Sequence, residues 1–288
     1  MPIFVADIIT VLKLRIGMAI ALTGVVGLVT APGPSVPAWK VALLAGAVLL
    51  ASASAGAFNH VVERKLDARM ARTRNRPFVR GAFRAGPLWY GIIFALLAAG
   101  VGGAAVGLGG MAALHVFLGA FVYGVVYTVI LKQRTTWNIV VGGLAGSFAV
   151  LAGAAVVDPN PGAIPLALAL VLFLWTPPHF WSLAMVCGDD YAAAGVPMLP
   201  VVVGNRTASR AVLGNTVLLV AASLVPFFFG LGWIYLAGAL LGGGLFLQRS
   251  IALVRSADTA TARRTFHASL VQLSLLLLGA LVDRAVLG

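Results

Sequence analysis

The feature of this sequence that most limits its possible folds is a series of long stretches that contain no Asp, Glu, Lys or Arg. These are residues 16–39, 41–62, 85–131, 135–157, 159–188, 211–248 and 265–282. A helix needs about 20 apolar residues to cross the hydrocarbon core of a bilayer. Five stretches have room for one such helix each, while 85–131 and 211–248 have room for two, which turn at the glycine-rich residues 100–110 and at 230–232. The sequence therefore predicts an all-α, polytopic membrane protein with nine transmembrane helices.

The composition agrees with a chain that is mostly surrounded by lipid. Of its 288 residues, 61% are apolar and 10% are charged, whereas soluble domains have about 45–50% and about 25%. The net charge of +12 would suggest a nucleic-acid partner in a soluble protein. Here the basic residues are grouped between the uncharged stretches, which argues against nucleic acid. The one cysteine, Cys187, excludes a disulfide framework and a cysteine-ligated zinc site.

The distribution of Lys and Arg predicts how the chain is oriented, because cytoplasmic loops of membrane proteins are enriched in these residues. With the N-terminus in the cytoplasm, nine helices put 18 of the 20 Lys and Arg residues on the cytoplasmic side. Only Lys40 and Arg284 then lie on the other side. We therefore expect one transmembrane domain over residues 1–288 in the inner (cytoplasmic) membrane, with the C-terminus on the side opposite to the cytoplasm.

The second predicted helix ends in an acidic stripe, Asn59, Glu63 and Asp67, whose members are spaced four apart. Residues at this spacing lie on one face of a helix, where two carboxylates repel each other. A divalent cation would reverse the sign of that interaction, and Mg²⁺ uses one or two carboxylates together with water and substrate phosphate oxygens. The stripe is thus a candidate metal and catalytic site. The alternative is a solvated helix end whose acids pair with nearby Lys and Arg.

A basic segment with six arginines follows the acidic stripe between residues 69 and 84. They are Arg69, Arg72, Arg74, Arg76, Arg80 and Arg84. Guanidinium groups bind phosphate oxygens through two parallel hydrogen bonds, so a basic segment beside a metal site suits a diphosphate. The alternative is a segment that only anchors the chain to lipid headgroups. We expect a short helix here, which Arg76-Pro77 ends.

A second acidic pair, Asp189 and Asp190, follows the sixth predicted helix on the same side of the membrane. It is a second candidate metal site, and Asp190 is also a candidate catalytic residue. The alternative is a pair of solvated acids in a loop. Two acidic sites on one face of a bundle favour a functional role for both over coincidence.

The sixth predicted helix carries two consecutive prolines with aromatic residues on both sides. The segment is Trp175-Thr176-Pro177-Pro178-His179-Phe180-Trp181. Two prolines free backbone carbonyls and are expected to break the helix, which a membrane protein tolerates only where the break is buried or lines a cavity. We expect the four aromatic residues, His179 included, to line that cavity, where rings stabilise a carbocation or pack on a flat macrocycle. The alternatives are a kink with interfacial tryptophans and, for His179, packing rather than ligation of a cofactor.

Taken together, these motifs resemble the UbiA-type intramembrane prenyltransferases, and in finer detail their protoheme IX farnesyltransferase (heme O synthase) branch. The stretches that carry the resemblance are NHVVERKLDARMARTRNRPFVRG from Asn59, YTVILKQRTTWNIVVGG from Tyr127, WTPPHFWSLA from Trp175 and DYAAAGVPMLPVVVG from Asp190. The chain departs from the superfamily at Glu63, where Asp is usual. It also has Ala193 and Ala194 where a further Asp often stands.

The resemblance implies nine helices bundled around a central cavity, and transfer of farnesyl from farnesyl diphosphate to the 2-vinyl group of protoheme IX, with water adding to give heme O. It implies Mg²⁺ as cofactor on the acidic stripe, with Asp189 or Asp190 available for a second ion. The candidates for the remaining diphosphate oxygens are Arg72, Arg76, Lys132 and Arg134. Protoheme IX is then a substrate rather than a permanent cofactor, and a heme A-forming enzyme is a candidate downstream partner.

Two other functions stay open at the level of sequence. One is a UbiA-type transferase that prenylates an aromatic quinone precursor, against which the WTPPHFW and AGVPMLP stretches argue. The other is an organic-anion transporter, a class that usually places ionisable groups near the bilayer midplane in related halves of the chain. The uncharged stretches carry no Asp, Glu, Lys or Arg in mid-span and show no repeat, which favours the enzyme.

Overall fold

The computed structural model describes residues 3–287, and over this range the chain is helical without any strand. The elements in chain order are α1 (Ile3–Val11), α2 (Leu14–Thr30), α3 (Ala38–Asp67), α4 (Pro87–Gly107), α5 (Gly110–Phe121), the π-helix η1 (Val122–Leu131), α6 (Asn138–Gly142), α7 (Leu144–Val157), α8 (Ala163–Val186), α9 (Gly188–Ala193), α10 (Leu199–Val203), α11 (Asn205–Phe228), α12 (Trp233–Ser256) and α13 (Thr259–Leu287).

The membrane spans agree with the expected number. Within residues 3–287, eight helical spans are long and apolar enough to cross a membrane, and α1 with α2 makes a ninth that bends by 44° at its break. Two of the eight consist of consecutive elements, α5 with η1 and α6 with α7. The two longest uncharged stretches turn close to the glycine residues that predicted the turns: α4 ends at Gly107 and α11 ends at Phe228. The predicted all-α fold with nine spans is confirmed.

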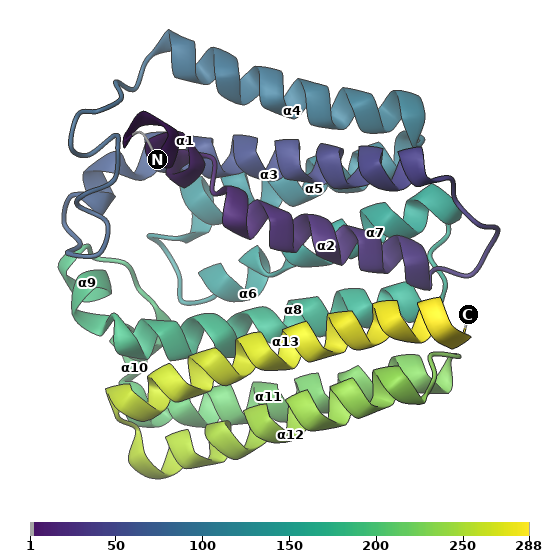
Figure 1. Ribbon diagram of the computed structural model, residues 1–288. Helices are drawn as coiled ribbons and strands as arrows, with labels where there is room; N and C mark the ends of the chain where they lie inside the picture. Colours follow the sequence, from purple (N-terminus) through teal and green to yellow (C-terminus); the bar gives the residue numbers. More distant parts are fainter. Residues whose placement is uncertain (1–2, 288) are drawn as a thin grey trace.

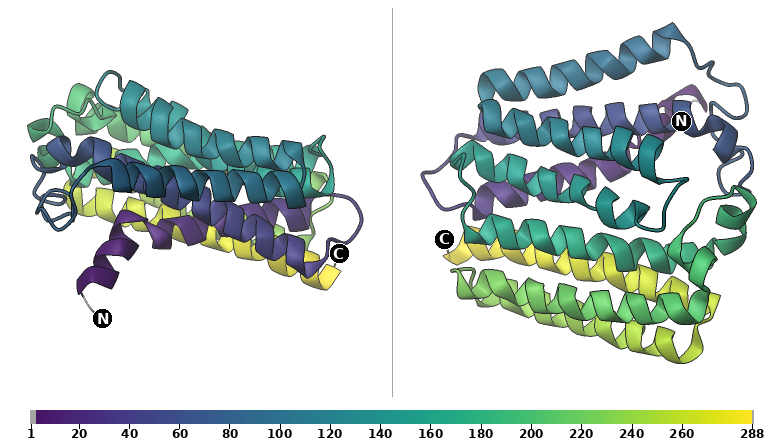
Figure 2. Two further views of the ribbon diagram at one scale, coloured as in Figure 1. Left: turned by 90° about the horizontal axis from the view of Figure 1, so that it is seen from above. Right: turned by 180° about the vertical axis from the view of Figure 1, so that it is seen from behind.

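The long helices run side by side, and their connections lie at the two ends of the bundle (Figure 1). The N-terminus, α9 and α10 lie at one end, on the left of Figure 1, and the C-terminus lies at the other. The view from above shows α1 turned away from the remaining helices at the same left end (Figure 2). The connection from α3 to α4, which contains the basic segment, is also at this end. The polar motifs of the sequence therefore share one end of the bundle.

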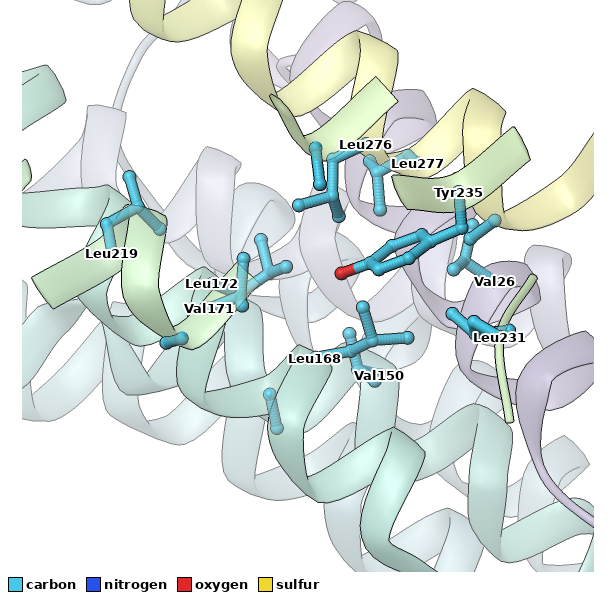
Figure 3. Close-up of a cluster of buried hydrophobic side chains, with 14 of the residues drawn as sticks. Val26, Val150, Leu168, Val171, Leu172, Leu219, Leu231, Tyr235, Leu276 and Leu277 are labelled. Atoms are coloured by element: carbon cyan, nitrogen blue, oxygen red, sulfur yellow. The ribbon is translucent and has the colours of Figure 1, made fainter. Parts of the chain in front are cut away.

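Small residues let the helices approach closely, as is usual where lipid gives no hydrophobic drive for helix association. A Cβ on Gly27 of α2 would lie 2.1 Å from the carbonyl oxygen of Val150, and one on Gly153 of α7 would lie 1.9 Å from that of Gly24. A core cluster drawn from α2, α7, α8, α11, α12 and α13 surrounds Tyr235, whose ring lies among leucine and valine side chains (Figure 3). The contacts at Gly27 and Gly153 leave no room for a larger residue where α2 and α7 cross.

Contrary to expectation, α8 does not break at its two prolines. It is continuous from Ala163 to Val186 and includes Pro177 and Pro178. Pro178 has no N–H for the carbonyl oxygen of Leu174, and the side-chain amide of Asn215 on α11 donates a hydrogen bond to that oxygen instead. A partner from a neighbouring helix is one way in which membrane proteins keep proline within a span. The freed carbonyl therefore joins α8 to α11 and does not end the helix.

The basic segment after α3 also differs from expectation, because residues 68–86 form successive turns and no helix. The Thr73 hydroxyl donates a hydrogen bond to the Asp67 carbonyl oxygen at 2.9 Å, and the Arg76 N–H donates one to the Thr73 carbonyl oxygen at 3.0 Å. These bonds fold the segment back over the end of α3. Arg76-Pro77 thus lies within a series of turns, and the Arg76 side chain returns to the acidic stripe.

At the opposite end of the bundle, Asp283 of α13 is buried and caps the first turn of α12. Its carboxylate accepts hydrogen bonds from the N–H groups of Gly232 at 2.6 Å and Ile234 at 3.2 Å, which a helix N-terminus leaves unpaired. We expect Asp283→Ala to lower the free energy of unfolding in mixed micelles by about 2 kcal/mol. The exposed Asp158→Ala should change it by less than about 0.5 kcal/mol. Equal losses in the two variants would contradict the capping role.

Candidate active site

The acidic stripe lies on the last turns of α3 and faces the interior of the bundle. Asn59, Glu63 and Asp67 are 2, 3 and 2% exposed, whereas Val62 and Lys65 on the other side of the helix are exposed. The spacing of four residues does put the three on one face. Their burial argues against the alternative of a solvated helix end.

Each member of the stripe accepts a hydrogen bond from a cationic side chain, and each cation comes from a different part of the chain. The three pairs are Lys13 Nζ with Asn59 Oδ1 at 2.7 Å, Lys132 Nζ with Glu63 Oε2 at 2.5 Å, and Arg76 Nη1 with the two Asp67 carboxylate oxygens at 2.9 and 2.8 Å. Lys13 is at the bend between α1 and α2, Lys132 directly follows η1, and Arg76 is in the turns after α3. Segments far apart in sequence thus converge on the stripe.

The charges in this site do not balance. Three cations face only two carboxylates, those of Glu63 and Asp67. In addition, Glu63 Oε1 is enclosed and has no hydrogen-bond partner among residues 3–287. An unpaired buried acceptor costs about 1–3 kcal/mol, and more when it is charged. A divalent cation on the carboxylate oxygens together with a polyanion on the basic side chains would satisfy both groups.

The donor set fits Mg²⁺ better than a metal that needs a closed protein cage. Within the described residues, no three Asp, Glu, His or Cys side chains gather closely enough to hold an ion by themselves. Mg²⁺ keeps several waters and takes one or two carboxylates along with substrate phosphates. The arrangement therefore suits a metal that binds together with a diphosphate. Binding of Mg²⁺ at the stripe stays a prediction.

The π-helix η1 faces the stripe from the other side. Thr128 Oγ1 accepts a hydrogen bond from Asn59 Nδ2 at 3.0 Å and donates one to the Tyr123 carbonyl oxygen at 2.8 Å. The Tyr123 hydroxyl accepts one from Lys13 Nζ at 2.6 Å. π-Helical turns are rare and occur mostly at functional sites. This turn brings a hydroxyl and a phenol to the Asn59 end of the stripe.

The two acids of the second pair have different surroundings. Asp190 of α9 accepts hydrogen bonds from the backbone N–H groups of Ala71 at 2.8 Å and Arg72 at 3.2 Å, whereas Asp189 is exposed. Arg72 Nη2 donates a hydrogen bond to the Tyr191 hydroxyl at 3.4 Å, and burial raises the pKa of that phenol, so that it stays neutral. The structure therefore brings α9 to the basic segment. Both Asp190 oxygens already hold that segment in place.

The four basic residues expected at a diphosphate are not equally placed. Arg76 and Lys132 are paired with acids of the stripe, and Arg72 lies beside Tyr191 with its guanidinium carbon 5.8 Å from the ring centroid. Arg134 is exposed beyond Lys132. Arg76 and Lys132 thus lie at the acidic stripe, whereas Arg72 and Arg134 are exposed, with Arg72 beside Tyr191.

The aromatic residues of α8 point in two directions. His179 stacks on Trp175 with ring centroids 4.1 Å apart and meets Phe180 edge-on at 5.1 Å. Phe180 packs against the cluster that contains Leu66, at the end of α3. Trp181 packs instead against α11 and α12. Phe180 and Trp181 face different neighbours because successive helical residues point about 100° apart, and the expectation that all four aromatic residues line one cavity stays a prediction.

The sequence matches the UbiA prenyltransferase family over residues 20–276. This chain belongs to that family. It is 57% identical to protoheme IX farnesyltransferase 2 of Paramagnetospirillum magneticum over 97% of both chains. It is 41% identical to the protoheme IX farnesyltransferase of Marinobacter nauticus, over 97% of this chain and 93% of that one. The resemblance expected from the motifs is confirmed, and the chain is a prenyltransferase.

Solved structures agree with the UbiA fold at low sequence identity. A digeranylgeranylglyceryl phosphate synthase superposes with a TM-score of 0.80 at 16% identity, covering 97% of this chain and 98% of that one. A UbiA homolog from Archaeoglobus fulgidus, bound to DMAPP and Mg²⁺, superposes with a TM-score of 0.74 at 15% identity, covering 98% and 100%. The arrangement of helices is therefore that of the family.

This UbiA-family site also contains residues that sequence reasoning missed. Lys13, Tyr123 and Thr128 were not singled out, although all three are bonded to Asn59 or to each other. One signal was available for Lys13, which together with Arg15 directly precedes the uncharged stretch 16–39. Its backbone adopts φ = 49°, a left-handed conformation that residues with a side chain rarely take and that tends to persist at functional sites. Thr128 lies in the stretch from Tyr127 that carries the family resemblance, but neither its residue type nor its spacing connects it with Asn59.

We expect Asp190→Ala in this prenyltransferase to lower kcat/KM by about 10-fold, because the segment that carries Arg72 loses its anchor and supporting contacts of this kind are typically worth 10- to 100-fold. The measurement is steady-state prenyl transfer at several Mg²⁺ concentrations, with Asp158→Ala as a control of equal charge change. An unaltered kcat/KM would contradict the role of Asp190. A higher Mg²⁺ requirement would show that Asp190 also binds metal, as the sequence suggested.

Proposed function

We propose that this chain transfers the farnesyl group of farnesyl diphosphate to the 2-vinyl group of protoheme IX, with addition of water, and so forms heme O. The observation that carries the proposal is the enclosed surplus of positive charge around oxygen ligands of the acidic stripe. The names of the relatives from Paramagnetospirillum and Marinobacter support it. The DMAPP and Mg²⁺ bound to the Archaeoglobus homolog support metal-assisted binding of a diphosphate.

Departure of the diphosphate is the step that the basic residues serve. The allylic C–O bond breaks with its electron pair on the diphosphate, and preorganised positive groups in an enclosed site stabilise that developing charge. The residues assigned to its oxygens are Arg76 and Lys132, which lie at the stripe, and Arg72 and Arg134, which are exposed. Mg²⁺, when bound by the acidic stripe, would neutralise the same leaving group as a Lewis acid. Arg76 and Lys132 already lie at the stripe, so each has only to exchange its carboxylate partner for a phosphate oxygen of the substrate.

The vinyl group of protoheme supplies the electrons for the new carbon–carbon bond. Its π electrons attack the farnesyl C1, and the positive charge moves to the vinyl carbon next to the porphyrin ring. Water adds there and releases one proton, so that no strong base is needed for the attack itself. The rings of Trp175 and Phe180 stabilise positive charge nearby through their π faces. Asp190 stays a catalytic candidate through its hold on Arg72.

Both substrates are largely apolar, so the reaction needs an apolar chamber next to the acidic stripe. In this structure Met70, Ile139 and Tyr191 are buried in one cluster with residues of α3 and α8. The central cavity implied by the sequence therefore stays a prediction. We place it between α3 and α8, where separation of this cluster would open it.

The chain is a multi-pass membrane protein, and we place it in the inner (cytoplasmic) membrane as one domain with its N-terminus in the cytoplasm. The diphosphate group of farnesyl diphosphate and the Mg²⁺ ion are both strongly hydrated. This favours a cytoplasmic position for the end of the bundle that holds the acidic stripe. A heme A-forming enzyme is the class of partner that would consume the product.

The test of this function uses the purified full chain with protoheme, farnesyl diphosphate and Mg²⁺, followed by mass spectrometry of the extracted heme. We expect a product heavier by one farnesyl group and one water, minus the leaving proton, and none in the presence of a chelator. Prenylation of an aromatic quinone precursor with no heme product would overturn the proposal and support the other transferase function.

A further inference from the structure

The imidazole of His179 is held on both faces and at one edge. Trp175 stacks on one side with a centroid separation of 4.1 Å, and Phe266 of α13 stacks with a separation of 4.6 Å. His179 Nδ1 lies 2.7 Å from Ser269 Oγ. The indole N–H of Trp175 donates a hydrogen bond to the Ser269 carbonyl oxygen at 2.8 Å. The ring orientation is therefore fixed by α8 and α13 together.

The hydrogen bonds around Ser269 fit one tautomer of neutral His179. A serine hydroxyl has one proton to donate. Ser269 Oγ donates it to the carbonyl oxygen of Phe266, at 2.6 Å. With the hydroxyl proton on the Phe266 carbonyl oxygen, Ser269 accepts from His179, and the tautomer that fits this pattern carries its proton on Nδ1. In that tautomer the lone pair is on Nε2, and the one hydrogen bond of the His179 ring among residues 3–287 is the bond at Nδ1.

This arrangement is typical of a histidine that binds a metal. Metal-ligating histidines almost always donate their other ring N–H to a fixed acceptor, which sets the tautomer and the orientation of the ring. Because Nδ1 donates to Ser269 and the rings of Trp175 and Phe266 stack on the imidazole, Nε2 is the ring atom left to bind a metal.

We propose that His179 Nε2 is an axial ligand to the iron of the porphyrin substrate, and that Ser269 is the residue that positions it. The inference rests on the proposed function, because it requires an iron porphyrin in the site. The Nε2 lone pair forms the bond to iron and displaces a weakly held water or anion, without change in the oxidation state of the metal. His179 also touches Phe180, which packs against the cluster at the end of α3. An iron ligand there sets the porphyrin beside the acidic stripe.

The first test compares ferric protoheme with iron-free protoporphyrin IX, titrated into the purified full chain and followed by absorption and electron paramagnetic resonance. We expect a histidine-ligated iron spectrum in the native chain that His179→Gln loses, with iron affinity at least 10-fold weaker. Binding of the iron-free porphyrin should be unchanged, because it has no metal to ligate. His267→Gln, an exposed histidine on α13, serves as the matched control.

A packing role for His179 makes the opposite prediction. If His179→Gln weakens both porphyrins equally, or if the histidine-ligated spectrum persists in it, the ligand assignment is wrong. In a His179→Gly variant, added imidazole should restore the iron spectrum, because it supplies the missing lone pair. If added imidazole does not strengthen the binding of iron protoheme to the His179→Gly variant, the assignment is also overturned.

The role of Ser269 is tested with the same spectra. We expect Ser269→Ala to weaken iron protoheme about 10-fold and to leave the iron-free porphyrin unaffected. Ser223→Ala is the matched control, because that buried hydroxyl donates only to its own helix, at the Leu219 carbonyl oxygen. Equal effects of the two variants would exclude a positioning role.

Failure of this inference is distinguishable from failure of the proposed function. A native chain that forms the farnesylated heme but shows no spectrum dependent on His179 overturns the ligand alone. A native chain that binds neither porphyrin and forms no heme product overturns both.

Discussion

Replacement of Asp67 by alanine is expected to lower kcat/KM for prenyl transfer on the order of 10³-fold, or about 4 kcal/mol in the barrier. Asp67 is 2% exposed and its two oxygens hold Arg76, so that one side chain serves both the metal and the basic group. Its loss removes a carboxylate from the acidic stripe and releases the guanidinium that should meet the diphosphate. The measurement is product formation at saturating Mg²⁺ in the purified chain.

Two further variants separate this chemical effect from misfolding. Asp67→Asn keeps the size of the side chain and one acceptor oxygen, and we expect it to be nearly as inactive because the negative charge is gone. Asp158→Ala removes an exposed carboxylate from the loop between α7 and α8 and should have native activity. Full activity of Asp67→Ala in a properly inserted chain would remove Asp67 from the site.

The large features of this fold could be predicted from sequence because they follow from the absence of charge. A bilayer admits only segments that satisfy their own backbone, so the uncharged stretches had to be helices of a fixed length. Glycine placed the turns after α4 and α11. The same reasoning failed for α8, because it counted the carbonyl that Pro178 frees but could not know that Asn215 of α11 lies beside it.

The candidate site could be predicted only in part, for a similar reason. Spacing along one helix gave the acidic stripe, since periodicity is local. The partners of the stripe come from other elements, and nothing in a single sequence connects Lys13 or Lys132 with residues 59 and 63. Pairing across the bundle depends on how helices pack, which is also why the sequence could not show that Trp181 faces α11 and α12.

Arg76→Ala is expected to raise the KM for farnesyl diphosphate about 10²-fold while changing the apparent Kd for protoheme much less. Arg76 is the group that already makes two charge-assisted hydrogen bonds in the site, to both oxygens of Asp67. Loss of one partner of such a pair typically costs about 2–5 kcal/mol, and 10²-fold corresponds to about 2.7 kcal/mol. Protoheme carries no diphosphate, so its affinity should not depend on this guanidinium in the same way.

Arg80 offers a control in the same basic segment. It pairs with Asp7 of α1 and not with the acidic stripe, so that Arg80→Ala removes an equal charge from the same end of the bundle. If both variants raise the KM equally, general attraction of an anion to a basic surface explains the effect. If Arg76→Ala instead weakens diphosphate and protoheme to the same extent, the residue holds the shape of the site and does not bind the leaving group. Only a selective loss for the diphosphate fits the exchange of Asp67 for a phosphate oxygen at Arg76.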